Sequence, residues 1–364
     1  MIPRIATVML AVFALGGATV RAEDSPRFVF VDGEQPEALQ TRLQSTGSRG
    51  YRLIATDEGT DVSGRSRVVV LLERDASGAK YEYAVRSGTG DLSDASMRLT
   101  IDPLFGQGYR LSSVGFVVRR WPEIWLPESA YDDQATLILE RDADSDLQWF
   151  YASLGFGTET TFYRALDDHR RQGFEILGLW NTDRKLQLVL QRPADRDRQA
   201  ASYTSDQDYR LLLIATRAVL KTKLNSMAKK GYRVREAEDP PTVGPPMLLV
   251  QRSVEAGKTL EYRFFKAVRK RMRNERFAEK LNKRAVNGWR LTPGGLTDSA
   301  YVLERDPKWK KKGQPSASYR LLSSSNAAEL ASDIAGAMEE GCTLVTMVVE
   351  PSRTSVLLEK FDAQ

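Results

Sequence analysis

The side chains that most often carry catalysis are scarce in this chain. It has one histidine, His169, and one cysteine, Cys342. A serine triad would have to use His169, which stands beside Asp167 and Asp168 in a helical stretch, and a triad is defined by geometry rather than by the presence of its members. One histidine and one cysteine also offer too few of the usual zinc ligands. We therefore interpret His169 as a surface or packing residue and predict no metal or other cofactor.

An acidic run at 142–146 begins like a calcium-binding loop. Leu147 stands where such a loop needs glycine, and Ser153 stands where it needs a chelating glutamate. We interpret the run as a polar turn. No glycine-rich phosphate loop is present. Pairs of carboxylates for acid–base catalysis need only proximity in space, so an enzymatic function stays open as an alternative.

Two segments suggest binding. The first follows an apolar stretch near position 118 and contains five candidate residues: Arg119, Arg120, Trp121, Trp125 and Tyr131. Tryptophan, tyrosine and arginine are enriched where proteins bind partners, and loops on a rigid scaffold often carry function. The other interpretation is that the tryptophans fold back and cover a sheet.

The second segment is basic. Its candidate residues are Lys266, Arg269, Lys270, Arg271 and Arg273. Residues 23–205 contain 22 Lys and Arg against 29 Asp and Glu, whereas residues 206–364 contain 29 against 19. Such asymmetry favours an anionic partner for the second half, or attraction between neighbouring copies. The alternative is a solvated charged face.

A phrase of glycine, a usually aromatic residue, a usually polar residue and an aliphatic residue recurs six times. The glycines are separated by 58, 65, 58, 57 and 53 residues and are Gly50, Gly108, Gly173, Gly231, Gly288 and Gly341. Recurrence at a nearly fixed period is typical of tandem repeats.

The stretch before each glycine is predicted to be a helix. Positions eleven and seven residues before the glycine are apolar in every copy: Leu39, Leu43, Met97, Ile101, Phe162, Leu166, Leu220, Leu224, Phe277, Leu281, Leu330 and Ile334. Apolar residues four apart form one stripe along a helix. The glycine is then expected to end the helix in a left-handed conformation.

Strands are predicted on both sides of this helix. An aromatic segment opens each unit, a half-buried strand follows the glycine, and an apolar run ending in Lys or Arg, such as 68–74, closes it. A run that is apolar at nearly every position indicates a strand buried on both faces, so we place it in the middle of three strands. The fold class is therefore α+β, with six tandem β-α-β-β repeats of mainly antiparallel three-stranded units. Because about 57 residues are marginal alone, we expect packing in pairs or as an array.

This pattern resembles a family of small bacterial β-α-β-β domains of unknown function, which open with a Tyr-Lys-Val-Val strand and carry a Gly-Trp-Glu-Leu-Val strand after the helix. The resemblance covers residues 23–364 six times over and implies no known active site. Cys342 departs from the aromatic position.

The expected organisation begins with a signal peptide at 1–22. Arg4, the apolar stretch 8–15 and Val20-Arg21-Ala22 match the three parts of such a signal. The expected repeats are 23–78, 79–145 with an insertion at about 115–131, 146–205, 206–256, 257–315 and 316–364. We therefore expect a periplasmic or secreted protein without a transmembrane segment.

These observations favour a non-enzymatic repeat scaffold or binding protein of the cell envelope. Its expected partner is an envelope protein or an anionic polymer, and self-association is a further possibility. Export makes nucleic acid an unexpected partner. The alternative is a glycan-acting or other hydrolytic enzyme whose carboxylates or serines converge between repeats.

Overall fold

A computed structural model describes thirteen stretches of the chain. They are residues 25–63, 65–88, 92–118, 135–156, 158–181, 186–195, 208–212, 216–238, 247–252, 260–266, 275–297, 300–307 and 317–361. The signal peptide expected at 1–22 lies outside them.

The described residues form six units, each with a strand, a helix and two further strands. Unit 1 contains β1 (Phe28–Gly33), α1 (Pro36–Gly47), β2 (Tyr51–Thr60) and β3 (Ser66–Arg74). Unit 2 contains β4 (Tyr81–Gly88), α2 (Ala95–Gly106), β5 (Arg110–Val118) and β6 (Ala135–Asp142). Unit 3 contains β7 (Trp149–Gly155), α3 (Glu159–Arg171), β8 (Glu175–Asn181) and β9 (Leu186–Pro193).

The last three units repeat this order. Unit 4 contains β10 (Tyr209–Leu212), α5 (Arg217–Lys229), β11 (Tyr232–Glu238) and β12 (Met247–Arg252). Unit 5 contains β13 (Glu261–Lys266), α7 (Glu275–Ala285), β14 (Arg290–Leu296) and β15 (Ala300–Arg305). Unit 6 contains β16 (Ala317–Ser324), α8 (Ala327–Glu339), β17 (Cys342–Val349) and β18 (Thr354–Phe361).

Each unit has one antiparallel three-stranded sheet, and the third strand lies between the first and the second. In unit 1 this central strand is β3, whose residues Val68 to Leu72 are all buried. A strand with neighbours on both edges and apolar groups on both faces needs such a sequence. The predicted α+β fold with six β-α-β-β repeats is therefore confirmed.

The repeat glycines end the helices as expected. All six have positive φ angles, between 80° and 91°: Gly50, Gly108, Gly173, Gly231, Gly288 and Gly341. A residue with a Cβ is strained in this region of conformational space, whereas glycine is not. The glycine therefore lets the chain leave each helix and enter the second strand directly.

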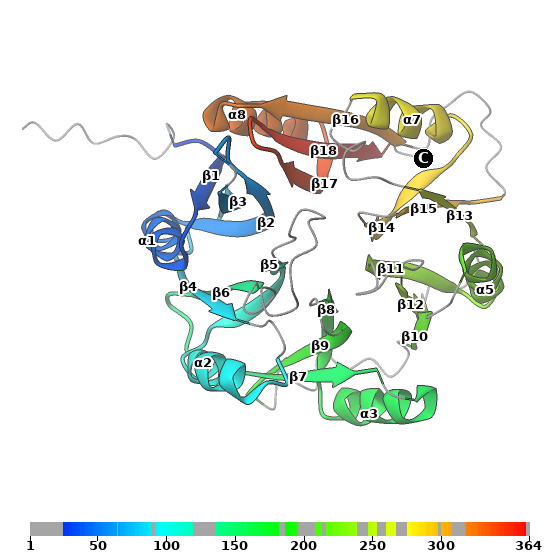
Figure 1. The fold of residues 1–364 in the computed structure, drawn as a ribbon, viewed down its shortest axis with the longest axis horizontal. Coiled ribbons are helices and arrows are strands. Elements are labelled where there is room, and N and C mark those ends of the chain that lie inside the picture. Colours follow the sequence, from blue (N-terminus) through cyan, green and yellow to red (C-terminus); the bar gives the residue numbers. More distant parts are fainter. Residues whose placement is uncertain are drawn as a thin grey trace, which may run out of the picture.

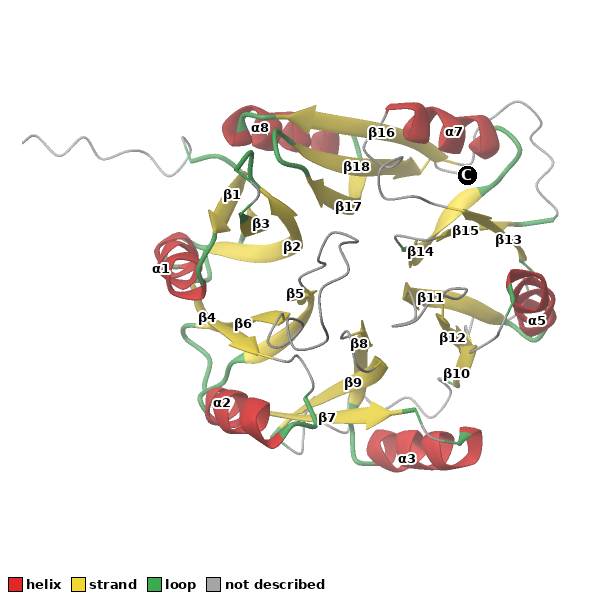
Figure 2. Cartoon of the chain, in the orientation of Figure 1, coloured by secondary structure: helices red, strands yellow, loops and turns green. Residues whose placement is uncertain are grey.

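The six units form a closed ring with the helices on the outside (Figures 1 and 2). The second strands lie nearest the centre, where β2 contacts β5 and β17 contacts β2. Each helix also reaches the next unit, as α1 does at β4 and α8 does at β1. The first and last units are therefore neighbours, and the array expected from the sequence closes on itself.

Six shared hydrophobic cores hold the ring together. In one of them, Leu39 and Leu43 of α1 pack with Tyr83 and Ile138 of unit 2. Corresponding cores join units 2 and 3, 3 and 4, 4 and 5, and 5 and 6. Each sheet thus has its own helix on one face and the core of the preceding unit on the other.

The sixth core closes the ring. Leu330 and Ile334 of α8 pack with Phe28, Val69 and Leu71 of unit 1. A backbone bond reinforces this contact, since the Val349 N–H donates to the Asp57 carboxylate at 2.8 Å. Unit 6 therefore completes a core that unit 1 cannot complete alone.

No helix among the described residues is both long enough and apolar enough to span a membrane.

The closing core predicts the effect of one substitution. Ile334→Ala removes a fully buried side chain of α8, and we expect it to lower the free energy of unfolding by roughly 3 kcal/mol. Leu281→Ala, at the same repeat position in α7, should lower the free energy of unfolding by a similar amount. It removes a buried side chain from the core between units 5 and 6, which follow each other in the sequence. Urea unfolding measures both. A much smaller cost at Ile334 would mean that α8 has no neighbour in unit 1.

Candidate functional site

The residues singled out in the sequence lie almost entirely outside the described stretches. This holds for Arg119, Arg120, Trp121, Trp125 and Tyr131, and for Arg269, Lys270, Arg271 and Arg273. Lys266 is the last residue of β13. The structure therefore does not bring these candidates together, and both segments stay predictions.

Buried tyrosine–carboxyl pairs are the most distinctive polar groups of the described chain. Tyr83 and Glu140 are opposite each other on β4 and β6, with the hydroxyl 3.2 Å from the carboxylate. Tyr319 on β16 and Glu359 on β18 form the same pair in unit 6. Tyr262 and Glu304 of unit 5 are likewise opposite each other. Burial raises the pKa of each of these tyrosines, so the hydroxyls stay protonated and can donate.

Glu140 shows what these pairs do. The residue is 2% exposed, and its carboxylate accepts a bond from the Leu53 backbone N–H of unit 1 at 3.1 Å. The guanidinium groups of Arg52 in unit 1 and Arg110 in unit 2 lie 3.3 Å away. A buried carboxylate needs such partners to offset its lost hydration. Glu140 therefore connects two units at the point where β2 has an irregular register.

The pair is varied from unit to unit. Tyr151 and Tyr209 are opposite Gln191 and Gln251, which have amide side chains instead of carboxyl groups. Unit 1 has Phe28 opposite Glu73, whose carboxylate pairs with Arg27 instead. One member of the pair is visible in the sequence, because every unit has Glu or Gln directly before its terminal basic residue. Its pairing partner could be identified only once the strand register was known.

In units 2, 3 and 5 the terminal basic residue lies over the ring of the residue that follows the repeat glycine. Arg141 lies 5.0 Å from the ring of Tyr109, Arg192 lies 5.0 Å from Phe174, and Arg305 lies 4.6 Å from Trp289. These are cation–π contacts between the residue after the repeat glycine and the end of the third strand. In unit 6 both members change, and Cys342 stands opposite Lys360. The residue after the repeat glycine and the basic residue that ends the third strand are therefore partners on neighbouring strands of one sheet.

Helix amides bond to the exposed edge of the next sheet. Asn282 of α7 accepts from the Tyr319 N–H at 2.7 Å and donates to its carbonyl at 2.9 Å. Asn225 of α5 bonds to Tyr262 in the same way, and Gln44 of α1 accepts from Tyr83. An unpaired strand edge invites further strands, and these amides occupy it.

Glu236 of β11 is a buried carboxyl group whose pKa is raised. Burial raises its pKa to about 7, opposed by a bond from the Leu179 N–H and by the nearby Arg235. The bond is 3.0 Å long and crosses from unit 3 to unit 4. A Cβ added to Gly178 would stand 3.1 Å from this carboxylate, so the two units meet closely here.

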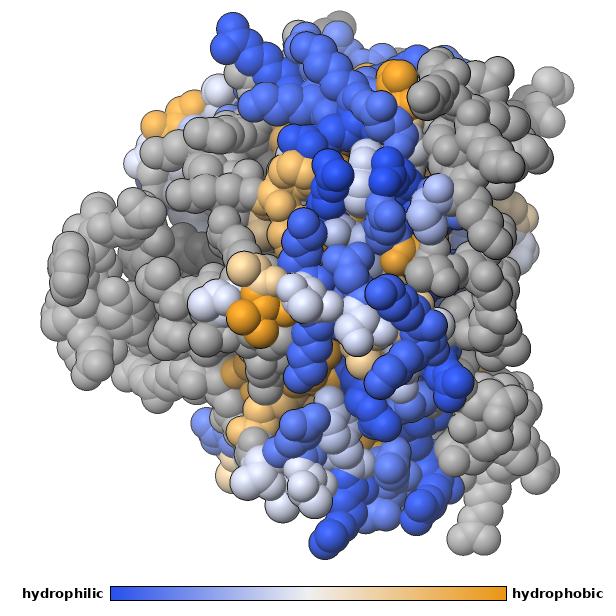
Figure 3. Space-filling model, turned by 90° about the vertical axis from the view of Figure 1, so that its right-hand side faces the viewer, coloured by the Kyte–Doolittle hydropathy of each residue, from blue (hydrophilic) through white to orange (hydrophobic). Residues whose placement is uncertain are grey.

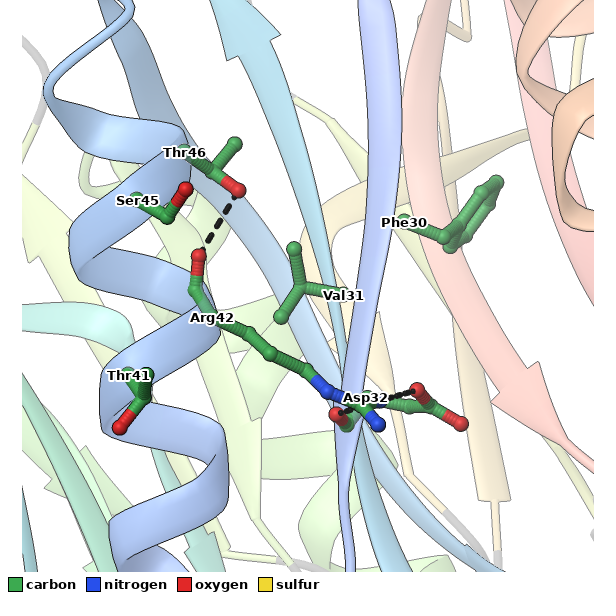
Figure 4. A pocket seen from close by; sticks show the side chains of 7 residues that line it. All are labelled: Phe30, Val31, Asp32, Thr41, Arg42, Ser45 and Thr46. Atoms are coloured by element: carbon green, nitrogen blue, oxygen red, sulfur yellow. Dashed lines mark hydrogen bonds and ion pairs between the residues drawn. The ribbon is translucent and has the colours of Figure 1, made fainter. Parts of the chain in front are cut away.

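A hollow of about 330 Å³ lies between β1 and α1 (Figure 4). Thr41, Ser45 and Thr46 line one side, and Asp32 faces them from β1. The Asp32 carboxylate pairs with Arg42 and, at 3.4 Å, with Arg67. This hollow therefore offers hydroxyl groups and an ion-paired carboxylate as polar contacts.

His169 and Cys342 occupy structural positions. The His169 Nδ1 atom lies 2.8 Å from the Ala165 carbonyl, and its ring packs edge-on against Phe174. Cys342 is buried as a free thiol. Within the described stretches, no three potential ligands are grouped so that they could hold a metal ion.

The outer helices differ sharply in charge. α5 contains Arg217, Lys221, Lys223 and Lys229, with Lys230 as its C-cap, and has no carboxylate. α8 contains Glu329, Asp333 and Glu339 and has no basic residue. The side of the ring that carries α5 displays a band of hydrophilic residues (Figure 3). The basic candidates predicted from the sequence are in 266–273 and not in α5. The amino-acid sequence of α5 nevertheless shows that this helix has no Asp or Glu.

No protein-family model matches the chain, and a comparison with curated proteins finds no relative. The function must therefore be argued from the chain itself.

The position of Glu236 predicts a pH dependence. Because its pKa is higher in the folded protein than the ordinary 4.5, the folded state binds the proton more tightly, and stability should fall as pH rises from 4.5 to about 7. Glu236→Gln keeps an acceptor for the Leu179 N–H and removes the titration. We expect the variant to gain on the order of 2 kcal/mol over the wild type between pH 4.5 and pH 8.

Chemical denaturation at a series of pH values measures this difference. The matched control is Glu82→Gln, which changes a carboxylate that is paired with Arg141 nearer the surface. A Glu236→Gln profile parallel to that of the wild type would show that Glu236 does not titrate in this range.

The junction hydroxyls give a second prediction. The Tyr319 hydroxyl accepts from the Leu291 N–H at 2.8 Å and donates to Glu359, both inside a buried junction. Tyr319→Phe leaves both groups without this partner and should lower the free energy of unfolding by about 2 kcal/mol. Tyr81→Phe, whose hydroxyl bonds to the surface residue Asp75, should cost less. Equal costs in thermal or urea unfolding would contradict a special role for the junction pair.

Proposed function

We propose that this chain is an exported, non-enzymatic scaffold of the cell envelope that holds another molecule on the outer rim of its ring. The observation that carries the proposal is the difference between buried residues, which recur among the units, and exposed residues of the rim helices, which do not. The buried apolar residues of the junctions recur from unit to unit. The exposed side chains of the rim helices differ, as the charges of α5 and α8 show. Variable, outward-facing residues on a rigid frame are typical of binding scaffolds.

The buried acids support a scaffold over the alternative, a glycan-acting hydrolase. Hydrolysis of a glycosidic bond usually needs two carboxyl groups facing a substrate cleft. Glu140, Glu304 and Glu359 are buried and bonded to tyrosine hydroxyls, and Glu140 and Glu304 also pair with arginines. Their bonds hold units together. These acids are therefore better suited to building the ring than to meeting a substrate.

Export belongs to the same proposal. It rests on the signal-like features of 1–22, and it predicts a mature chain that begins at Glu23. The tryptophan-containing insertion, with Trp121 and Trp125, remains a second proposed contact for a protein partner.

Site-specific photo-cross-linking in cells tests the scaffold function. A photoreactive residue is placed at Thr222 on α5, at Ser332 on α8 or at Thr100 on α2, three exposed positions on rim helices, and at Thr343 on the inner strand β17 as control. We expect a discrete adduct from at least one rim position and none from Thr343. Adducts from the inner position alone, or from no position, would contradict a scaffold that works through its rim.

A further inference from the structure

Among the described side chains of α5 and its C-cap, every charged one is an exposed lysine. Its opposite side carries Leu220, Leu224 and Ala228, which are buried in the core shared with unit 5. The helix therefore cannot rotate, and the remaining positions must face outward. Lys221, Lys223, Lys229 and Lys230 are exposed there. Within the described chain, none of these four ammonium groups forms an ion pair.

Three other rim helices each pair an exposed arginine with an acid. Arg42 of α1 pairs with Asp32, Arg98 of α2 pairs with Asp102, and Arg171 of α3 pairs with Asp168. Concentrated charge of one sign raises the local potential and attracts counter-ions. Among the residues that the structure describes, lysines without an ion pair thus distinguish α5 from α1, α2 and α3.

The basic side continues into the next unit. Lys280 and Lys283 are exposed on α7, which follows α5 around the ring (Figure 1). We call these six residues the lysine rim: Lys221, Lys223, Lys229, Lys230, Lys280 and Lys283. A ligand that contacts the whole lysine rim must extend over two helices, so it must be long.

The residue types restrict the ligand further. Lysine presents a compact, hydrated point charge, which suits phosphate groups without demanding the planar two-bond geometry that arginine provides. A helix that inserts into a membrane needs an exposed apolar face, whereas the apolar face of α5 is buried and Val219 is its single described exposed large apolar side chain. These facts favour a polymer in solution over a bilayer.

We propose that the lysine rim binds a linear polyanion whose negative charges are phosphate groups. The proposal rests on the scaffold function above and names the class of molecule that the rim holds. Binding is electrostatic and requires no particular sequence in the polymer. Each lysine that neutralises a phosphate releases a counter-ion, so affinity falls steeply with salt.

The test uses the mature protein and labelled long-chain inorganic polyphosphate, with binding followed by fluorescence anisotropy at several salt concentrations. The variant is Lys221→Gln/Lys223→Gln/Lys229→Gln/Lys230→Gln. The matched control is Arg65→Gln/Arg98→Gln/Arg171→Gln/Arg320→Gln, which removes the same charge from exposed arginines of units 1, 2, 3 and 6. Thermal unfolding of all three proteins checks that the ring is intact.

We expect the lysine variant to bind at least about tenfold more weakly at low salt and to reduce the slope of log affinity against log salt by about 3. The arginine control should bind within about threefold of the wild type. Tripolyphosphate, which is too short to reach both helices, should bind far more weakly than the polymer.

Several outcomes would overturn the proposal. Equal losses in both variants would mean that overall charge, rather than the lysine rim, attracts the polymer. Tighter binding to a carboxylated polysaccharide than to polyphosphate would exclude phosphate as the preferred group, and binding only to anionic lipid vesicles would replace the polymer with a membrane. If rim photo-cross-links persist while polyphosphate fails to bind, this inference fails and the scaffold function stands.

Discussion

The packing of α8 against unit 1 is the contact on which the closed architecture depends. Every sheet in this protein is apolar on both faces, and its own helix can cover only one of them. The other face needs the helix of the preceding unit. For unit 1 this cover comes from unit 6, through Leu330 and Ile334 of α8. A ring leaves no unit with a bare face, whereas an open array needs capping units with polar outer faces.

Polar bonds then fix how neighbouring units meet. Glu140 joins Leu53 of unit 1 to its own sheet, and Asn282 bonds to both backbone groups of Tyr319 in the next unit. Within the part of the chain that the structure describes, the junction between units 6 and 1 lacks these polar bonds between tyrosine and helix amide. Unit 1 has Phe28 at the tyrosine position, and α8 has Ala335 where α7 has Asn282. Close apolar packing and the Asp57 bond to Val349 hold this junction instead.

Much of this fold could be predicted from the sequence. The glycine period, the apolar stripe at Leu39 and Leu43, and the continuous apolar run of β3 define the unit, its helix and its central strand. Ring closure could not be predicted, because it depends on the angle between successive units, which no local pattern encodes. The tyrosine–glutamate pairs also required the strand register. The charge asymmetry indicated a basic region in the second half. The pairing of surface charges was needed to distinguish the lysines of α5, which form no ion pair among the described residues, from paired arginines such as Arg98.

Cross-linking across the closing junction tests the ring most directly. In a Cys342→Ser background, Asp57→Cys and Glu350→Cys place two thiols where unit 1 and unit 6 meet in the wild type, at the position of the bond from Val349 to Asp57. A short bis-maleimide is then added. The ring predicts an intramolecular cross-link that forms at any protein concentration and increases mobility on a denaturing gel. The control pair Asp57→Cys/Lys229→Cys should form none, because it joins β2 to α5, which lie on opposite sides of the ring (Figure 1). A cross-link that is absent, or that appears only between molecules at high concentration, would contradict closure.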